Sequence, residues 1–294
     1  MNSVSIEQGF DRLRMQWAMR GWTPLSNGLL RIRAGIAGHP IRAYWWSDVP
    51  NFGDRLTPLL LQHFGFAPIH SGPEGAEIAA SGSILQNLPE DYRGIILGAG
   101  FVSANKAGRY RRATILALRG KLTRAIVAPD RAVALGDPGL LASELVPIRP
   151  VKRTVVGIVP HYLDRWNEAV RALRKRHGAE IRIIDPTWSP LTVVRAIGSC
   201  ECILSSSLHG IVAADSLGIP NRWLTLSSNV FGGRFKFDDY HSALGLTQEP
   251  ASLSGRESVS ELVALTEMKP VKEVAKVKSG LLGLFRSLKE VMTR

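Results

Sequence analysis

Cysteine is scarce in this chain: only Cys200 and Cys202 occur among its 294 residues. Two thiols cannot complete a tetrahedral zinc site by themselves and do not indicate a disulfide scaffold, so we predict that both only pack on one face of a strand. No apolar run reaches 18 residues, which excludes a helix that spans a membrane. Residues 1–14 contain two acids and no apolar core, which excludes a secretory signal. These absences predict a protein of the reducing cytoplasm.

The composition is that of a folded protein, with 45% hydrophobic and 21% charged residues. The apolar content excludes intrinsic disorder, and the length allows one large or two medium domains with substantial cores. No internal repeat or low-complexity tract is visible.

Positive charge is concentrated at the two ends of the chain. The formal net charge is 37 − 25 = +12, of which residues 1–42 contribute 6 − 2 = +4 and residues 269–294 contribute 7 − 2 = +5. The middle 226 residues therefore carry only about +3. A protein that binds nucleic acid is expected to place its charge on a folded groove or recognition helix, so we predict no nucleic-acid partner.

The C-terminal segment has the pattern of an amphipathic helix. Its apolar residues recur at steps of three and four, and lysines and arginines surround them; the apolar residues are Val274, Val277, Leu281, Phe285, Leu288 and Met292. Near the N-terminus, Trp17 and Trp22 lie among arginines in a similar way. Two interpretations remain open, a helix packed on its own domain and a helix lying on an anionic membrane surface.

From residue 41 onward, short apolar runs alternate with amphipathic segments, which predicts an α/β fold with buried parallel strands. A polar, proline-containing stretch at 142–153 suggests a linker between two such series. We therefore predict two doubly wound, Rossmann-like domains with a cleft between them. The expected divisions are a basic arm or first helix at 1–40, an N-terminal α/β domain at 41–147, a C-terminal α/β domain at 148–250 and a helical tail at 251–294. Strands are expected at 41–48, 76–85, 93–101, 113–120, 154–161, 179–186, 201–207 and 219–226. Residues 51–65 are expected to form a loop that leads into a helix, and further helices are expected at 164–178, 192–200 and 208–218.

An uneven distribution of charge marks the first candidate site. Residues 92–129 contain no acid but eight basic residues: Arg93, Lys106, Arg109, Arg111, Arg112, Arg119, Lys121 and Arg124. Arginine recognises carboxylate and phosphate in a bidentate way, so this stretch favours an anionic ligand, with a solvated basic face as the alternative. Gly98-Ala-Gly100 follows a strand but lacks the third glycine and the later acid of a dinucleotide fingerprint, which argues against NAD.

Other candidates follow strands of the predicted sheets, where open α/β sheets bind their ligands. Ser205, Ser206 and Ser207 precede His209 and Gly210 at a strand-to-helix junction, where hydroxyls and free backbone N–H groups can hold an anion. A histidine there can donate to phosphate or move a proton near neutral pH, although a lone histidine is more often structural.

Two further titratable side chains are candidates for proton transfer. His161 ends a strand in the same way as His209. Asp54 opens the first predicted helix and is either a helix cap or a carboxylate that serves as general base. No Asp/His cluster has metal-ligand spacing, so we predict that no metal is required.

Several segments resemble, in order, those of polysaccharide pyruvyl transferases. They are NFGDRLTPLL (51–60), SGSILQ (81–86), LGAGF (97–101), LRGKLTRAIV (118–127), GDPGLL (136–141), GIVPHY (157–162), SSSLHGIVAADSLGIPN (205–221) and FKFDDYHSALG (235–245). The resemblance covers roughly residues 41–245, and so many segments in register make it specific. Ser207 stands where many members have arginine. Members of the subgroup of bacterial exopolysaccharide ketal transferases also have a small residue there, so we interpret Ser207 as a trait of that subgroup. That difference removes one candidate arginine, so Arg119 or Lys236 would have to replace it.

The resemblance implies a two-domain fold like that of GT-B glycosyltransferases, no cofactor, and transfer of pyruvate from phosphoenolpyruvate to a sugar as a cyclic ketal. We assign His209 as phosphate contact and proton donor, Arg119 as carboxylate or phosphate clamp, and Asp54 or His161 as base. Substrate-binding roles are predicted for Asn51, Gly53, Gly100, Lys121, Ser206, Ser207, Gly210 and Lys236.

The implied acceptor is a lipid-linked oligosaccharide or polysaccharide unit at the inner face of the cytoplasmic membrane, where the basic termini could make peripheral contact. A glycosyltransferase that uses a nucleotide sugar is the nearest alternative, because Glu201, Asp215 and Asp238 are available to hold a ribose. A basic nucleic-acid-binding protein and an inactive scaffold are the alternatives from another class.

Overall fold

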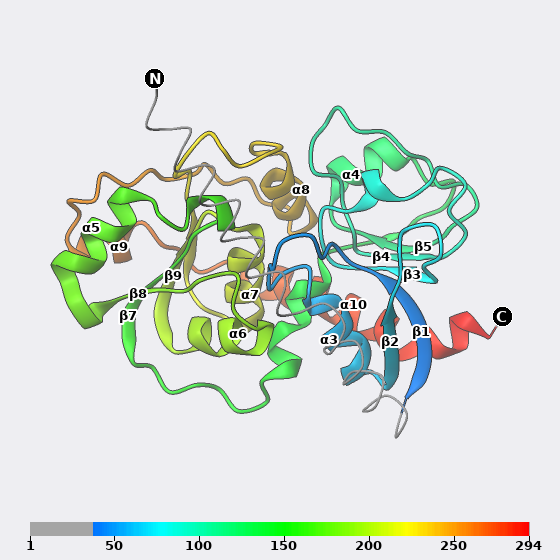
Figure 1. The fold of residues 1–294 in the computed structure, drawn as a ribbon, viewed down its shortest axis with the longest axis horizontal. Helices are drawn as coiled ribbons and strands as arrows, with labels where there is room; N and C mark the ends of the chain where they lie inside the picture. The colour runs from blue at the N-terminus through cyan, green and yellow to red at the C-terminus, as the bar shows by residue number, and fades with distance from the viewer. Residues whose placement is uncertain (1–37, 294) are drawn as a thin grey trace.

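The computed structural model describes residues 38–293 and places them in two α/β halves (Figure 1). The first half is built on a six-stranded parallel sheet. Its strands are β1 (His39–Tyr44), β2 (Phe66–His70), β3 (Ile78–Ala79), β4 (Ile95–Leu97), β5 (Thr114–Leu118) and β6 (Ala134–Leu135), and its helices are α3 (Leu56–His63), α4 (Lys121–Val127) and the 3₁₀ segments η1 (Leu85–Asn87) and η2 (Pro138–Leu145).

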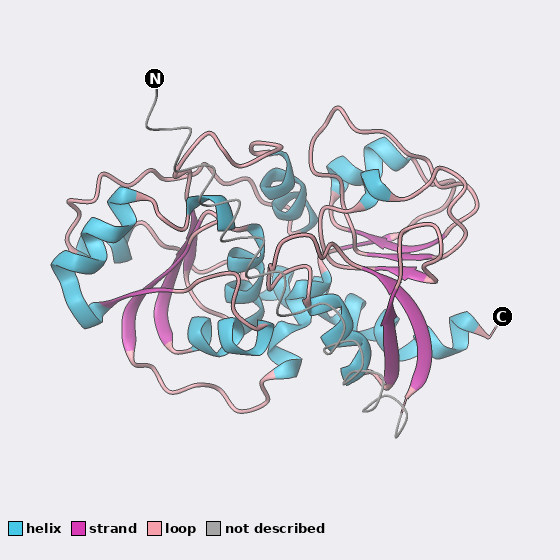
Figure 2. Cartoon of the chain, viewed as in Figure 1, coloured by secondary structure: helices cyan, strands magenta, loops and turns pink. Residues whose placement is uncertain are grey.

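The second half is built on a four-stranded parallel sheet (Figure 2). Its strands are β7 (Thr154–Val159), β8 (Ile181–Ile183), β9 (Cys200–Ser205) and β10 (Asn221–Trp223). Its helices are η3 (Tyr162–Asp164), α5 (Glu168–His177), η4 (Gly178–Glu180), α6 (Pro190–Gly198), α7 (Leu208–Leu217), α8 (Phe235–Ala243) and α9 (Val259–Ala264), and the chain ends in α10 (Val271–Met292).

The four strands of the second sheet have the same order as the first four strands of the first sheet. The first runs β2-β1-β3-β4-β5-β6, and the second, read from its far edge, runs β8-β7-β9-β10. In each half the second strand lies on one side of the first and the third strand on the other, so the connections diverge between β1 and β3 and between β7 and β9. Such switch points leave a crevice beyond the carboxyl ends of the strands, which is where ligands bind in open α/β sheets.

The predicted α/β class with two parallel, Rossmann-like sheets is confirmed, whereas the GT-B arrangement stays a prediction. All eight predicted strands and the four predicted helices are present, several of them shorter than expected. The sequence reading missed β2, β6, α4 and α8. Cys200 and Cys202 are buried, and burial raises the pKa of each thiol to about 11, so both are unreactive as predicted.

The largest core cluster is shared by the two halves. It includes Phe52 and Leu140 of the first half and Leu208 and Ile211 of the second, all buried. Segment η2 lies between α3 and α7 and supplies three fully buried side chains to this cluster: Leu140, Leu141 and Ala142. Because a packed apolar core has few alternative arrangements, the shared core holds the two switch points in a defined relation.

The predicted C-terminal amphipathic helix is α10, and it returns to pack on the first half (Figure 1). Its predicted apolar stripe is covered by protein: Leu281, Phe285 and Leu288 are buried in the shared core, and Val274, Val277 and Met292 pack against it. This confirms the interpretation of a helix packed on its own domain and removes the apolar face from any membrane contact. The exposed outer face keeps Lys276 and Arg286, so peripheral contact through charge alone stays a prediction.

The predicted basic arm or first helix at 1–40 falls almost entirely outside the described residues. Among residues 38–293, no helix is both long and apolar enough to cross a membrane.

Candidate active site

The candidate site lies where the two switch points face each other. The segments after β1 and β3 provide Asp54 and Ser81, and the segments after β7 and β9 provide His161 and His209. Contacts between the halves join these segments directly, such as the hydrogen bond that Phe52 N–H donates to the carbonyl of Pro186 (2.8 Å). Residues far apart in the sequence are thereby gathered around one region.

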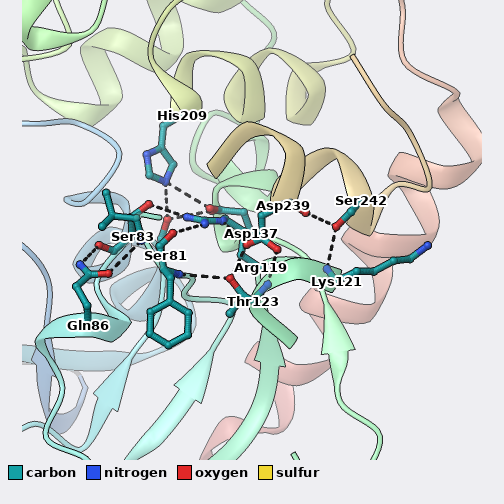
Figure 3. Close-up of polar contacts among 12 residues, drawn as sticks. Ser81, Ser83, Gln86, Arg119, Lys121, Thr123, Asp137, His209, Asp239 and Ser242 are labelled. Carbon is teal, nitrogen blue, oxygen red and sulfur yellow. Dashed lines mark hydrogen bonds and ion pairs between the residues drawn. The ribbon is translucent and has the colours of Figure 1, made fainter. Parts of the chain in front are cut away.

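His209 is held at the centre of this region by two residues of the first half (Figure 3). The hydroxyl of Ser81 donates to Asp137 Oδ1 (3.0 Å), so its oxygen is left to accept from His209 Nε2–H (2.9 Å). The same Nε2 lies 3.6 Å from Asp137 Oδ2. Nδ1 forms no hydrogen bond to any described residue, and 7% of the side chain is exposed. Nδ1 is therefore the ring nitrogen available to a ligand.

Asp137 and His209 shift each other's pKa. Burial acts to lower the pKa of His209, but the charge and hydrogen bonding of Asp137, with the charge of Asp54, outweigh it and raise that pKa above its ordinary value. Burial acts to raise the pKa of Asp137, but His209 and the Gly139 N–H that Oδ1 accepts (2.8 Å) lower it. The pair therefore favours a protonated imidazole beside an ionised carboxylate, which is the state required of a general acid.

Asp54 is a buried carboxylate close to this pair. Burial raises the pKa of Asp54 to about 6, against the opposing positive charges of His209 and Lys236. Asn51 Nδ2 donates to Asp54 Oδ2 (2.8 Å), so Asn51 orients this carboxylate. The interpretation of Asp54 as a helix cap is wrong, because the residue that flanks α3 is Arg55. A carboxylate with a pKa of about 6 can serve as a general base at neutral pH.

Lys236, on the first turn of α8, is the buried cation of the site. Burial and the charge of Arg119 lower the pKa of Lys236 to about 8, and the negative charges of Asp54 and Asp164 oppose this shift. Its ammonium forms no hydrogen bond or ion pair within the described part of the chain, and its contact is with the ring of Phe237, 5.5 Å from Nζ to the centroid. An unpaired buried cation is costly, so this position favours an anionic ligand.

His161 borders the same region but differs from His209 in charge. Burial and the positive charge of Lys236 lower the pKa of His161 to about 3, so its ring is neutral. Nδ1 accepts from Leu163 N–H (3.3 Å), which places the proton on Nε2 and makes that nitrogen a donor. Ser206, a predicted ligand contact, instead accepts from His161 N–H (2.8 Å) and donates to Asp164 Oδ2 (3.0 Å).

Arg119 has partners other than those predicted. Its side chain is 0% exposed and donates to Asp239 Oδ2 (2.9 Å), Ser83 Oγ (2.6 Å) and the carbonyl of Phe101 (2.5 Å). Asp239 lies on α8 and also accepts from Thr123 N–H (2.8 Å), so it caps α4, whose own N-cap is a glycine. In this structure Arg119 joins the two halves, and its role as a ligand clamp stays a prediction.

The stretch without acids does not form one basic site. Arg109, Arg111 and Arg112 precede β5 and are exposed at the opposite end of the sheet from His209. Glu90, Asp91 and Asp130 line the same surface hollows, so acids separated in sequence meet these arginines in space. The alternative of a solvated basic face is therefore correct for most of the stretch. Lys121 is exposed too, and Figure 3 shows its side chain extending away from His209.

The predicted glycines of the site make room for neighbouring side chains. A Cβ at Gly53 would overlap the ring of His209, one at Gly100 would overlap the guanidinium of Arg119, and one at Gly210 would overlap Ser205 Oγ. Gly100 therefore accommodates an arginine rather than a pyrophosphate. Ser207 is the N-cap of α7 and its side chain makes no cap hydrogen bond. Among the described residues, no cluster of three His, Cys, Asp or Glu side chains could hold a metal ion, and the prediction that none is required stays a prediction.

Comparison with known proteins agrees with the resemblance. The family model described as polysaccharide pyruvyl transferase matches residues 89–228, a range that contains Arg119, Asp137, His161 and His209. The chain belongs to the polysaccharide pyruvyl transferase family. No solved structure matches it.

Two curated relatives of this family member are similar over part of its length. The succinoglycan biosynthesis protein ExoV of Rhizobium meliloti (strain 1021) is 28% identical over 216 residues, which cover 70% of this chain and 66% of the relative. The uncharacterized protein L143 of Acanthamoeba polyphaga mimivirus is 31% identical over 164 residues, which cover 53% of this chain and 56% of the relative. The matches thus span less than two thirds of either relative.

Sequence reasoning on this pyruvyl transferase family member missed Ser81, Asp137 and Asp164 as parts of the site. Each lies in or beside a segment that carries the resemblance, but none has a local pattern that separates it from an ordinary turn residue or helix cap. Asp137 does cap η2 through Gly139 N–H, and only its second oxygen faces His209.

Proposed function

We propose that this chain transfers the pyruvyl group of phosphoenolpyruvate to two hydroxyls of a sugar in an exopolysaccharide repeat unit, forming a cyclic ketal and releasing phosphate. The observation that carries the proposal is the pairing of His209 with Asp137 (3.6 Å), together with the unpaired buried cation Lys236, since the charges of His209 and Lys236 both act on Asp54. Phosphoenolpyruvate needs both features, because its phosphate and carboxylate require cations and its C3 must be protonated.

In the first step, His209 Nδ1–H gives its proton to C3 of phosphoenolpyruvate. An acceptor hydroxyl oxygen bonds to C2, and Asp54 takes the proton of that hydroxyl. In the second step, the bond from C2 to the phosphate oxygen breaks, and phosphate leaves with the electron pair and the proton held by Asp54. The second hydroxyl oxygen bonds to C2 and gives its proton to His209, which restores both groups. Asp54 suits the role of base better than His161, whose pKa near 3 makes it a weak acceptor.

Lys236 is proposed to bind the donor together with Ser207 and the free N–H groups at the start of α7. A helix N-terminus favours negative charge, and α7 begins directly after Ser207. His161 Nε2–H is a further donor to the same anion. Lys236 thereby supplies the cation that many family members place at position 207.

Lys236→Gln is expected to abolish stabilisation by the donor, because the substitution removes the unpaired cation. At 100 times its dissociation constant, phosphoenolpyruvate should stabilise the wild-type protein by about 2.7 kcal/mol, visible as a rise in thermal midpoint. Lys121→Gln, at an exposed position outside the site, should respond like the wild type. A shift with UDP-glucose in place of phosphoenolpyruvate would contradict the proposal and favour a glycosyltransferase.

The structure offers little to a nucleotide-sugar donor. Glu201 lies at the start of β9, away from the carboxyl end of the sheet, and Asp215 accepts from Asn221 (2.6 Å) and Tyr240 (2.7 Å). Asp238 is paired with Arg234 (2.6 Å). None of these acids is left to bind a ribose.

The two proton-transfer groups predict a bell-shaped dependence of kcat/KM on pH. Asp54 must be ionised, so activity should fall as pH drops through about 6. His209 and Lys236 must be protonated, so activity should fall again as pH rises through the pKa of Lys236, about 8, and through the raised pKa of His209. Asp54→Asn should lower activity and remove the acid limb while it keeps the alkaline one. Steady-state phosphate release across pH measures both limbs, and an unchanged acid limb in the variant would exclude Asp54 as the base.

A further inference from the structure

A cavity of about 420 Å³ opens at the carboxyl ends of β9 and β10, against the start of α8. It is formed by Ser206, by the chain from Trp223 to Ser228, and by the segment that leads into α8. Its volume lies within the roughly 300–1,000 Å³ of small-ligand pockets. The mechanism above does not use this cavity.

The cavity has no unpaired charge. Among the described residues that line it, Arg234 is the one charged side chain, and its guanidinium pairs with Asp238 (2.6 Å) and Glu249 (2.9 Å). A phosphate or carboxylate would therefore find no free cation here, in contrast to the position of Lys236. The cavity accordingly suits a neutral ligand.

Its walls combine hydroxyls with apolar surface. Ser206 and Ser227 both donate to the buried Asp164, over 3.0 and 2.5 Å, which fixes that wall. Thr225 and Ser228 are exposed hydroxyls, whereas the half-buried Leu226 and Val230 contribute apolar area. A sugar has this same mixture, with hydroxyls at its edge and C–H groups on its faces.

Two exposed aromatic residues belong to segments that border the cavity. Phe231 is 66% exposed and lies in the segment between the lining residues Val230 and Gly233. Trp166 is 62% exposed, and its neighbour Asn167 donates to the carbonyl of Leu226 (3.1 Å), another lining residue. Single exposed rings separated by polar groups are suited to stacking on a saccharide chain.

We propose that this cavity is the subsite for a neutral sugar of the acceptor glycan and that Phe231 and Trp166 hold the adjoining sugar units. The inference rests on the proposed function, which places the donor at Lys236. Phe237 forms part of the wall of the cavity and its ring also contacts Lys236, so the cavity and the donor position share this residue. A sugar seated here lies beside the proposed donor site, so its hydroxyls can reach the pyruvyl carbon.

Direct binding tests the subsite without turnover. Lactose and cellobiose serve as neutral probes in saturation-transfer NMR on the full chain without phosphoenolpyruvate, and folding of each variant is checked by circular dichroism. Ser228→Trp, which fills the cavity, should abolish transfer to the probes, and Phe231→Ala should weaken their binding about 3- to 10-fold. Trp188→Ala removes an exposed tryptophan after β8, at the far edge of the same sheet, and should leave binding unchanged.

The same variants separate this proposal from the proposed function. Thermal stabilisation by phosphoenolpyruvate should be equal in the wild type and Ser228→Trp. If the probes bind and Ser228→Trp removes them while phosphoenolpyruvate never binds, the sugar subsite stands and the donor assignment fails. If the wild type binds neither probe, or if Ser228→Trp still binds them, the subsite is overturned. Binding of UDP that Ser228→Trp removes would overturn it in favour of a nucleotide.

Discussion

Replacing His209 with glutamine is expected to lower kcat about 10²- to 10⁴-fold, the usual contribution of a general acid. Glutamine keeps a polar side chain near Ser81 but cannot transfer a proton at neutral pH. The KM for phosphoenolpyruvate should change far less than kcat, because Lys236 and the start of α7 remain. Steady-state release of phosphate with a saturating acceptor measures both constants.

The effect of His209→Gln should be specific to this histidine. His63, exposed on α3 and outside the site, provides the matched substitution, and His63→Gln should retain full activity. Asp137→Asn should lower kcat less than His209→Gln and shift the alkaline limb of the pH profile to lower pH, since the charge of Asp137 raises the pKa of His209. If His209→Gln keeps more than about a tenth of the wild-type turnover, His209 is not the general acid.

Arg119→Met is expected to destabilise the fold by about 3–5 kcal/mol, the cost of leaving one member of a buried ion pair without its partner. Both Arg119 and Asp239 have fully buried side chains, and the arginine also donates to Ser83 and Phe101. The variant removes the ion-pair partner of the buried Asp239 carboxylate between α4 and α8. Urea denaturation measures the free energy of unfolding.

A substitution on the same helix provides the comparison. Arg124 is exposed on α4, and Arg124→Met should change the free energy of unfolding by no more than about 0.5 kcal/mol. The two roles considered for Arg119 predict different results. A clamp on the ligand predicts near wild-type stability with a raised KM for phosphoenolpyruvate, and that outcome would overturn the structural role described here.

The ion pair of Arg119 with Asp239 belongs to a set of contacts that hold α8 against the first half. Asp239 accepts from Thr123 N–H, and Ser242, on the next turn, accepts from Lys121 N–H (2.8 Å). These bonds satisfy the free N–H groups at the start of α4 with side chains from the other half of the molecule. Because Lys236 lies on the same helix as Asp239, this contact also determines where the proposed donor-binding cation stands.

Local pattern was sufficient for most of the fold. The apolar runs at β7 and β9 and the amphipathic segment at α5 were predicted because burial of these residues imposes a periodicity that the sequence displays. Strands β3 and β6, with two residues each, carry almost no such signal. Strand β2 contains a proline and ends at a histidine, so its apolar run is interrupted. The β3 region was found only because the surrounding residues are apolar.

Some residues of the candidate site could also be predicted from local sequence, and others could not. His209, Asp54, His161 and Lys236 could be selected from the sequence because each is a titratable residue in a segment that follows a strand or resembles the family. Asp137 could not, because its local role as a cap of η2 explains it fully until the second half of the molecule places His209 beside its other oxygen.

The sequence by itself therefore determined the α/β class, the two parallel sheets, most of their strands and the family, since these depend on local periodicity and on motifs in register. Only the tertiary structure decided which charges act together. In the folded chain Arg119 pairs with Asp239 and Asp137 lies beside His209. The arginines before β5 are exposed away from the site, and the apolar stripe of α10 is covered by the core. The physical reason is that electrostatic coupling depends on distance and burial in space, and residues 72 positions apart, such as Asp137 and His209, acquire both only when the two halves share one core.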